Sequence, residues 1–302
     1  MVTLVENLLI KILLIGCNGQ VGWELVRTLA PLGEVVAVAR PEIDLANADS
    51  TAGWVRRTEP DVIVNAGAYT DVDGAESDPN TARTVNARAP GILATEAERL
   101  GSALIHFSTD FVFDGEKNNP YRETDPPRPL GVYGRTKLEG ELAVAEAGDS
   151  GVVLRTAWVY SLRRPSFVTK VLEWSRKSQD LRIVADQTGS PTWCRMLAEA
   201  TARIIAMGGD DPAGFLRERR GIYHLACTGA ASRLEWARAI LEYDPHPEEQ
   251  QAREIRPAMT SDFPAPAIRP IYSVLDCTKF ADAFGFRLPP WEEALRLAME
   301  AG

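Results

Sequence analysis

The first half of the chain alternates short apolar runs with longer amphipathic stretches. The runs are rich in β-branched residues and carry almost no polar group, which is typical of strands buried on both faces. Between them lie segments with helical periodicity, such as residues 22–32, where Leu25, Val26 and Leu29 share a face. The alternation predicts βαβ units and a parallel sheet covered on both sides by helices. The predicted strands are at residues 12–15, 35–38, 62–64, 103–105 and 152–154.

The pattern becomes irregular after Leu154, which predicts a smaller mixed α/β lobe. Ligands of open α/β sheets bind at the carboxyl ends of the strands, so we expect this lobe to close over a substrate there. Residues 8–155 are expected to form a Rossmann-type, doubly wound dinucleotide-binding domain, and residues 156–302 mainly the substrate lobe. Some segments, such as 222–226, can return to the main sheet. Short helices are predicted at 165–177, 196–207, 232–243 and 291–300, and loops at the Pro- and Gly-rich segments 118–131 and 257–270.

Composition and charge narrow the class of protein. The 302 residues are 45% hydrophobic and 25% charged, as in ordinary globular proteins. A net charge of -9 argues against a nucleic-acid partner, although a small anion can still bind a local cluster of donors. Residues 1–10 lack the basic lead of a secretory signal, and no apolar run reaches the ~20 residues of a membrane span. A soluble protein is therefore expected.

The cysteines and histidines offer no metal-ligand or disulfide spacing. The 4 cysteines lie far apart without a C-x-x-C pair, which disfavours a disulfide framework or a zinc site. The 3 histidines are equally scattered, so histidines without a metal are expected. Free thiols suit a reducing compartment, and we predict a cytoplasmic location.

A glycine-rich turn follows the first predicted strand and opens the first helix. Gly16, Gly19 and Gly22 have the spacing G-x-x-G-x-x-G. Glycines there allow a sharp turn and a close approach of the backbone to a pyrophosphate, which sits on the amides of a helix N-terminus. The motif predicts dinucleotide binding, with a plain strand-to-helix turn as the alternative.

The residues after the second predicted strand bear on the choice of cofactor. A carboxylate at this place would bind the adenosine ribose of NAD, but the chain has Ala39 followed by Arg40. An arginine can receive a ribose 2′-phosphate, which favours NADPH, while a solvated surface arginine is the alternative. Asp44 could support the adenine side and leaves NADH possible.

Tyr133 and Lys137 form a Y-x-x-x-K pair, so both side chains can share one side of a helix. A lysine ammonium beside a phenol favours the phenolate, and the pair predicts a tyrosine whose pKa is lowered for general acid chemistry. The pair lies downstream of a strand ending Ser108-Thr109-Asp110, whose hydroxyls are expected at the carboxyl edge of the sheet. With 7 tyrosines in the chain, a chance pair is the alternative.

These motifs together resemble a known family. G-x-x-G-Q-x-G at residues 16–22, N-A-G-A-Y-T at 65–70, S-T-D at 108–110 and the Tyr133–Lys137 pair resemble the extended short-chain dehydrogenases. Longer strings at 70–76, 111–115, 155–160, 186–192 and 265–270 are similar to those of the dTDP-4-dehydrorhamnose reductase family. The resemblance spans residues 11–299. It implies the last step of dTDP-L-rhamnose synthesis, the reduction of a 4-keto-6-deoxy sugar nucleotide by NADPH or NADH.

The resemblance also implies roles for single residues. Tyr133 would protonate the C4 oxygen as hydride reaches C4, Lys137 would hold the nicotinamide ribose and tune Tyr133, and Thr109 would bind the reacting oxygen. Further cofactor contacts would come from Gly16, Gly19, Gln20, Val21, Gly22, Arg40, Asp44, Leu45, Ala66, Ala68, Tyr69 and Thr70. Substrate contacts would come from Asp110, Trp158 and Arg269, with an ordinary core aromatic as the alternative for Trp158.

Two departures from the family pattern limit what is carried over. Some members have an aromatic hydroxyl where this chain has Phe111, so one possible sugar contact is missing. Some bridge a dimer through magnesium held by glutamates; Glu24 matches one such position, but Arg195 occupies another. A cation in place of a carboxylate repels a metal ion, so no metal is expected, and the chain is expected to be a monomer or a homodimer.

Three alternatives remain within reach of the same residues. Dehydratases of this fold carry a glutamate after Ser-Thr-Asp, and Phe111 removes that base. A sugar-nucleotide epimerase would use the same tyrosine and lysine. A non-catalytic NADP-binding regulatory subunit would keep the fold without turnover, although Thr109, Tyr133 and Lys137 together favour an enzyme.

Overall fold

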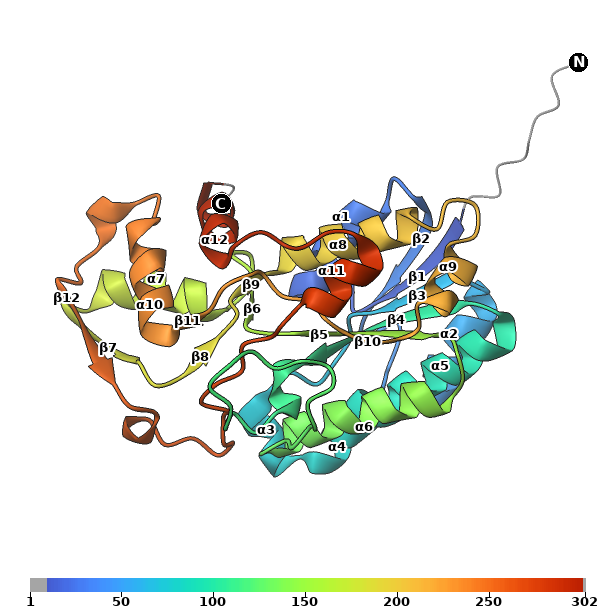
Figure 1. Cartoon of the computed structure of the whole chain (residues 1–302), viewed down its shortest axis with the longest axis horizontal. Coiled ribbons are helices and arrows are strands. Elements are labelled where there is room, and N and C mark those ends of the chain that lie inside the picture. Colours follow the sequence, from blue (N-terminus) through green and yellow to red (C-terminus); the bar gives the residue numbers. More distant parts are fainter. Residues whose placement is uncertain (1–9, 301–302) are drawn as a thin grey trace, which may run out of the picture.

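A computed structural model describes residues 10–300 of the chain (Figure 1). The outer ends of the two predicted domains, residues 8–9 and 301–302, lie outside this range. So does nearly all of the segment 1–10, for which the sequence predicted no secretory signal. A six-stranded, all-parallel sheet has the order β10-β5-β4-β3-β1-β2. The predicted Rossmann-type α/β fold is confirmed. The strands are β1 Ile10–Ile15, β2 Gly33–Val38, β3 Val62–Asn65, β4 Ala103–Thr109, β5 Gly151–Thr156 and β10 Gly221–His224.

Helices cover both faces of this sheet because alternate strand residues point to opposite sides. In β1, Ile12 and Leu14 belong to a core shared with α1 and α8, whereas Leu13 and Ile15 belong to a core shared with α2 and α5. The helices on the first side include α1 Gln20–Leu29, α8 Cys194–Ala206, α9 Pro212–Glu218 and α11 Thr278–Phe284. The other side and its edge carry α2 Ala48–Thr58, α3 Val72–Ser77, α4 Pro79–Arg83, a π-helical turn Thr84–Arg88, α5 Ala89–Leu100 and α6 Val132–Glu146.

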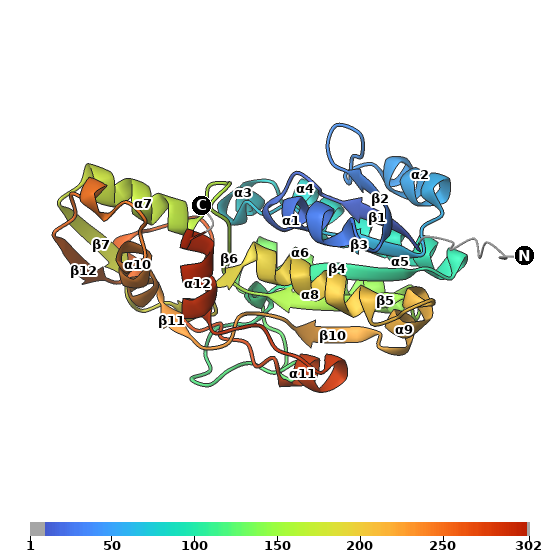
Figure 2. The same ribbon diagram turned by 90° about the horizontal axis from the view of Figure 1, so that it is seen from above.

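A second lobe lies at one end of the molecule in both ribbon views (Figure 1, Figure 2). The sheet strand β5 leads directly into β6 at the start of this lobe, so the lobe lies off the carboxyl ends of the strands. Parallel pairs β12–β7 and β6–β9 and the antiparallel pair β11–β8 form its short sheets. Its elements are β6 Val159–Tyr160, α7 Phe167–Lys177, β7 Asp180–Val184, β8 Thr188–Gly189, β9 Thr192–Trp193, β11 Ala231–Ser232, α10 Arg233–Glu242, β12 Glu254–Ala258 and α12 Trp291–Glu300.

The chain crosses between the two lobes more than once. After β9 it returns through α8, α9 and β10, and β10 pairs with β5 at the edge of the main sheet. The division at residue 155 stays a prediction. One predicted loop begins too early, because Pro257 and Ala258 end β12. Pro257 is tolerated since β12 pairs only with β7 and an edge strand does not need every N–H group.

Candidate active site

The glycine turn joins β1 to α1 with almost no spare room. Gly16 has a φ of +85°, and its N–H donates to the carbonyl of Val38 at the end of β2, 2.8 Å away. A Cβ on Gly16 would lie 2.7 Å from the nitrogen of Gly67, and one on Gly22 would lie 2.0 Å from the oxygen of Gly16. Only glycine fits at both positions, because the turn, the start of α1 and the loop after β3 touch through their backbones.

The N-terminus of α1 is suited to an anion. Its N-cap residue, Gly19, makes no side-chain capping hydrogen bond, so the first amides of this ten-residue helix have no side-chain acceptor at the cap among the described residues. Open amides beside a tight glycine turn fit the pyrophosphate of a dinucleotide. Next to them, Oε1 of Gln20 is buried and has no hydrogen-bond partner among the described residues, so it can accept only from a donor group of a ligand. Val21 is half-buried in the same turn of helix.

Residues expected near the adenosine half of a cofactor lie beside this turn. Arg40 is exposed two residues beyond Val38, and no ion pair involves it within residues 10–300. Asp44 is exposed and its Oδ1 accepts a hydrogen bond from the N–H of Ala46 at 2.9 Å. The side chain of Leu45 packs against Gly67, where a Cβ would meet its Cδ1 at 2.8 Å. Their contact with a cofactor stays a prediction.

The loop after β3 is fixed between the glycine turn and α6. The N–H of Ala66 donates to the carbonyl of Ile15 at 2.9 Å. Farther along, Asn86 accepts from the N–H of Tyr69 at 2.8 Å and donates to the carbonyl of Tyr69 at 3.1 Å. Its amide nitrogen also reaches Oγ1 of Thr136 at 3.2 Å. Asn86, which sequence reasoning missed, therefore holds the segment containing Ala68, Tyr69 and the exposed Thr70.

The end of β4 and the first turn of α6 meet at Tyr133. The side chain of Thr109 lies close enough to the Tyr133 hydroxyl to lower its pKa, and Oγ1 of Thr109 donates to Oδ1 of Asp110 at 3.1 Å. Phe111 approaches the tyrosine ring edge-on, with ring centroids 5.6 Å apart. The structure thus brings Thr109, Asp110 and Tyr133 together, as their order in the sequence predicts.

The predicted lowering of the Tyr133 pKa by Lys137 is wrong for this structure. Burial raises the pKa of Tyr133 to about 12; the charge of Asp110 adds to the rise, and the neighbouring side chain of Thr109 opposes it. Lys137 faces away into the sheet, where its Nζ donates to the carbonyl of Phe107 at 2.6 Å. Burial lowers the pKa of Lys137 itself to about 8, against the charge of Glu141.

The hydroxyl of Ser108 does not lie at the carboxyl edge of the sheet, where the sequence predicted it. Its hydroxyl is buried and donates to Oε1 of Glu141 at 2.5 Å, away from the carboxyl edge. Side chains alternate along a strand, so Ser108 faces α6 on the opposite side from its neighbours Phe107 and Thr109. Of the hydroxyls on this strand end, only that of Thr109 lies beside Tyr133.

Asp110 is buried beside Tyr133 with one oxygen unused. Its Oδ2 has no hydrogen-bond partner among the described residues. Burial raises the pKa of this carboxyl to about 6, while the hydroxyls of Ser273 and Thr109 and the charge of Arg233 lower it in part. An orphaned oxygen on a partly ionised carboxyl group is ready to accept a ligand hydroxyl.

Trp158 is held in a strained backbone conformation next to these groups. Its φ is +45°, which is rare for a residue with a large side chain. A Cβ on Gly189 would lie 2.4 Å from Cε2 of the indole, so the ring packs directly on the glycine backbone. On the ring lies the guanidinium of Arg233, 3.5 Å from its centroid. Strain of this kind is typical of functional positions.

Two arginines from the second lobe differ in their pairing. Arg269 donates to Oδ2 of Asp73 at 2.7 Å and to the carbonyl of Ala267 at 3.0 Å, so it ties the loop after β12 to α3. Arg233 has no side-chain hydrogen bond or ion pair within the described residues, and burial lowers its pKa to about 9. Sequence reasoning missed Arg233. Its place in the first turn of α10 is readable from the Ser232 capping box, but its direction toward Trp158 is not.

The two residues that bear on the predicted absence of a magnesium site, Glu24 and Arg195, lie on α1 and α8. Glu24 and Arg195 line one cavity of about 480 Å³ together with Trp23, Arg27 and Arg163. The guanidinium groups of Arg27 and Arg163 lie 3.2 and 4.3 Å from the centroid of the Trp23 ring. Three arginines lie around Glu24, and the other nearby carboxylate, Glu199, is already paired with Arg195 at 2.8 Å, so the group does not suit a hard metal ion. The expectation of an enzyme without metal stays a prediction.

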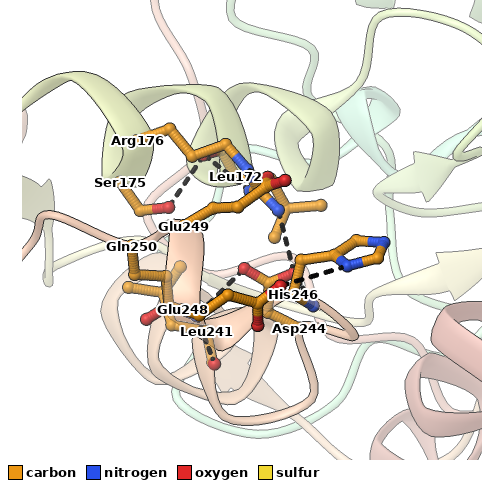
Figure 3. Close-up of polar contacts among 9 residues, drawn as sticks. All are labelled: Leu172, Ser175, Arg176, Leu241, Asp244, His246, Glu248, Glu249 and Gln250. Atoms are coloured by element: carbon orange, nitrogen blue, oxygen red, sulfur yellow. Dashed lines mark hydrogen bonds and ion pairs between the residues drawn. The ribbon is translucent and has the colours of Figure 1, made fainter.

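A second group of possible metal ligands comprises His246, Glu248 and Glu249 (Figure 3). All are exposed, and Glu249 is already bound by Arg176, whose Nε lies 2.6 Å from it. The same arginine donates to the buried Asp244 at 3.0 Å. The cluster closes a loop of the second lobe against α7, and we assign it no ligand.

Comparisons with known proteins agree with this geometry. The RmlD substrate binding domain family matches residues 10–302. A dTDP-4-dehydrorhamnose reductase of Burkholderia thailandensis is 44% identical over 298 residues, covering 96% of this chain and 98% of the relative. A crystal structure of a dTDP-4-dehydrorhamnose reductase from Clostridium acetobutylicum has a TM-score of 0.88 at 31% identity, covering 97% of this chain and 99% of its own. The enzyme of that name from Bacillus anthracis, solved in complex with NADP, has a TM-score of 0.87 at 28% identity, with coverage of 97% and 99%.

Proposed function

The chain belongs to the dTDP-4-dehydrorhamnose reductase family, and we propose that it reduces dTDP-4-dehydro-6-deoxy-L-mannose to dTDP-L-rhamnose with NADPH. The observation that carries the proposal is the group at the carboxyl end of β4, where Thr109 lies beside Tyr133 and next to the orphaned oxygen of Asp110. Proton donor, oxygen ligand and sugar ligand are then adjacent, at the edge where such sheets bind ligands.

The cofactor would lie along the carboxyl edge from the glycine turn to α6. Gly19, Gln20 and Val21 would hold its pyrophosphate on the open N-terminus of α1. Farther out, Arg40 would receive the 2′-phosphate of NADPH, and Leu45 would lie near the adenine. The loop anchored by Asn86 would pass along the nicotinamide half. NADH remains usable because Arg40 adds affinity only for the 2′-phosphate. When bound, the cofactor supplies the hydride that adds to C4.

Tyr133 would act as the general acid. With a pKa of about 12 the phenol is protonated at neutral pH and can give its proton to the C4 oxygen while Thr109 holds that oxygen by a hydrogen bond. The carbonyl becomes a hydroxyl, and Tyr133 is left as a phenolate. Lys137, one helical turn away, would hold the nicotinamide ribose. When charged, it would stabilise the phenolate once proton transfer has formed it, by turning from the Phe107 carbonyl that it contacts in the structure.

The substrate would be bound mainly from the second lobe. Asp110 would accept a sugar hydroxyl at Oδ2, and Trp158 would contact the sugar nucleotide. Arg233 has no carboxylate partner among the described residues and would bind the diphosphate of the sugar nucleotide. Arg269, paired with Asp73, would act by shaping the loop beside the substrate.

Phe111 argues against the related dehydration reaction. Loss of water across C5 and C6 of the sugar needs a base after Asp110, and the ring that stands there packs on Tyr133 and has no titratable group. The reduced cofactor must then be consumed and not recycled. A regulatory subunit without turnover would have no use for the paired Thr109 and Tyr133.

The experiment that tests the proposal is an assay of the purified protein with the keto-sugar nucleotide and NADPH. We expect one NADPH to be oxidised for each sugar reduced. No NADPH oxidation, or conversion of dTDP-glucose to its 4-keto-6-deoxy product without added reductant, would overturn it. Repeating the assay and a solution-mass measurement with EDTA tests the expected independence from magnesium and reports whether a monomer or a homodimer is present.

The cellular location is a further proposal. All four cysteines are free, with Cys194 and Cys227 buried, which supports a reducing compartment such as the cytoplasm. Among residues 10–300, none of the helices has the length and apolarity that crossing a membrane requires.

A further inference from the structure

Three buried polar side chains stand in a row behind the candidate active site. Asn65 at the end of β3 faces His106 of β4 across the parallel ladder, and His106 faces Lys137 of α6. Asn65 and His106 are 0% exposed and Lys137 is 2% exposed. None of the three has a carboxylate partner among the described residues, so the row must be satisfied by neutral donors and acceptors.

The direction of the Asn65 amide follows from its backbone neighbour. The N–H of Gly67 lies 3.1 Å from Oδ1 of Asn65 and can only donate, so that atom must be the carbonyl oxygen. The amide nitrogen, a donor, then faces Nδ1 of His106 at 3.1 Å. Nδ1 must accept this hydrogen bond, which leaves the proton of the neutral imidazole on Nε2.

The ring is neutral because burial holds the pKa of His106 well below its ordinary value, and any positive charge on Lys137 lowers it further. Its Nε2–H therefore points at Nζ of Lys137, 3.3 Å away. An ammonium group has no lone pair, so a charged Lys137 would set donor against donor. The neutral amine can accept from Nε2–H and still donate to the carbonyl of Phe107 at 2.6 Å.

We propose that His106, fixed by Asn65 with its proton on Nε2, is a positioning residue that aims Lys137 at the Phe107 carbonyl and favours its neutral amine form. The inference rests on the proposed function in assigning Lys137 to the support of Tyr133. It does not make His106 a catalytic residue, since His106 lies behind Lys137 and has no contact with Tyr133 among the hydrogen bonds of the structure.

The charge state of Lys137 also depends on the other charged groups around it, and His106 acts against those that favour the ammonium form. On its own helix these are Glu141, which raises the pKa of Lys137, and Tyr133. Arg155 on β5 is neutralised by its pair with Glu141, and Asp110 lies beyond Tyr133. Burial and the Nε2–H group act against Glu141, and the resulting pKa of about 8 keeps Lys137 near its titration point at working pH. A group that assists proton transfer is most effective there.

Activity measurements test the effect on Lys137. Charged Lys137 is needed to stabilise the phenolate, so kcat/KM should fall as the pH rises through the pKa of Lys137. His106→Gln has a carbonyl oxygen that can face the ammonium, and we expect this high-pH limb to move up by about one pH unit. The matched control is His224→Gln, at another buried histidine, whose Nδ1 contacts the carbonyl of Tyr121 at 3.0 Å. A limb that is the same in wild type and His106→Gln would overturn the proposal.

A second measurement needs neither turnover nor a folded variant. In ¹⁵N NMR spectra of histidine-labelled wild-type protein, the two buried rings should be neutral near pH 7 and carry opposite tautomers. His224 should be protonated on Nδ1, which faces a carbonyl, and His106 on Nε2. If both buried rings carry the Nδ1 proton, the proposal fails even for an active enzyme. If wild-type protein instead shows the predicted tautomers but does not reduce the keto-sugar, the proposed function fails and the buried row stands.

Discussion

Helix α6 carries two buried ionisable side chains one turn apart, Glu141 and Lys137, and the surrounding residues compensate the charge of Glu141 far better than that of Lys137. Glu141 is surrounded by donors: Arg155 donates to its two oxygens at 2.9 and 2.6 Å, and Ser108 donates to Oε1 at 2.5 Å. Lys137 has no carboxylate within salt-bridge distance among the described residues and contacts only a carbonyl and a histidine ring. The first group is an ion pair enclosed in the core; the second is a charge left poorly compensated.

This difference distinguishes side chains that stabilise the fold from side chains that take part in the chemistry. The buried ion pair joins β4, β5 and α6, although Nη1 of Arg155 has no hydrogen-bond partner among the described residues. Removing one member of the pair leaves an uncompensated charge. A buried group with incomplete partners keeps a shifted pKa, which is typical of functional sites. Asp110 and Tyr133 belong with Lys137, since burial raises their pKa values to about 6 and about 12. Four variants test this division.

The largest effect is expected from Tyr133→Phe. Loss of the phenolic proton should lower kcat by about 10²–10⁴-fold, the usual contribution of a positioned general acid. The fold should remain, because the Tyr133 hydroxyl makes no hydrogen bond of good geometry among the described residues, and the phenylalanine ring keeps the edge-on packing against Phe111. Steady-state kinetics measures the first effect, and NADPH titration and thermal unfolding measure the second. A variant with near wild-type kcat would show that Tyr133 belongs with the residues that stabilise the fold and does not donate the proton.

Glu141→Gln should act mainly on stability. Removing the carboxylate leaves the buried Arg155 without its counter-charge, at a cost of about 3–5 kcal/mol in the free energy of unfolding. Glu139→Gln, on the same helix but in the exposed pair with Arg83, is the matched control and should cost far less. Urea unfolding measures both. In surviving Glu141→Gln protein the high-pH limb of kcat/KM should move down, because the charge that raises the pKa of Lys137 is gone.

Asp110→Asn should stabilise the protein above pH 6 while impairing turnover. The pKa of Asp110 is raised from 3.8 to about 6 in the folded state, so the folded protein keeps this proton when the unfolded chain has lost it. Stability is therefore unaffected below about pH 4, falls as the pH rises to 6, and is then lower by at most about 3 kcal/mol. The neutral amide removes this penalty.

Asp114 is the control for the sign of that effect. Burial alone would raise its pKa, but the Tyr121 hydroxyl, the Glu116 N–H and Arg128 bring the pKa below the ordinary value. Asp114→Asn should thus lose stability at neutral pH, where Asp110→Asn gains it. Unfolding curves at pH 4 and pH 7.5 decide both. If Asp110→Asn is destabilised at pH 7.5, the carboxyl group is better compensated than the geometry indicates.

Arg40→Ala should give the smallest effect, because an exposed charge is stabilised by water and not by the fold. The variant should weaken NADPH binding by roughly three- to tenfold and leave NADH binding unchanged, since only NADPH carries a 2′-phosphate. Fluorescence titration with both cofactors measures it. Equal changes for the two cofactors would show that Arg40 is an ordinary surface residue.

Much of the fold could be predicted because it depends on local patterns. Runs such as residues 12–15 and 62–64 became β1 and β3, and the glycine spacing placed a turn that accepts no side chain at Gly16 or Gly22. The order of Thr109, Asp110 and Tyr133 along the chain was enough to predict that they meet. The return of β10 to the main sheet was expected only as one option, since a four-residue strand carries little sequence signal.

Hydrophobic period and motif spacing act within one element, so the family, the parallel sheet and the residues that end its strands could be predicted from the chain alone. The directions of side chains between elements depend on how those elements pack. That packing turned Ser108 toward Glu141, Lys137 toward Phe107 and His106, and Arg233 onto Trp158. Those directions depend on contacts between residues distant in sequence, and burial at such contacts sets the pKa values on which the chemistry depends.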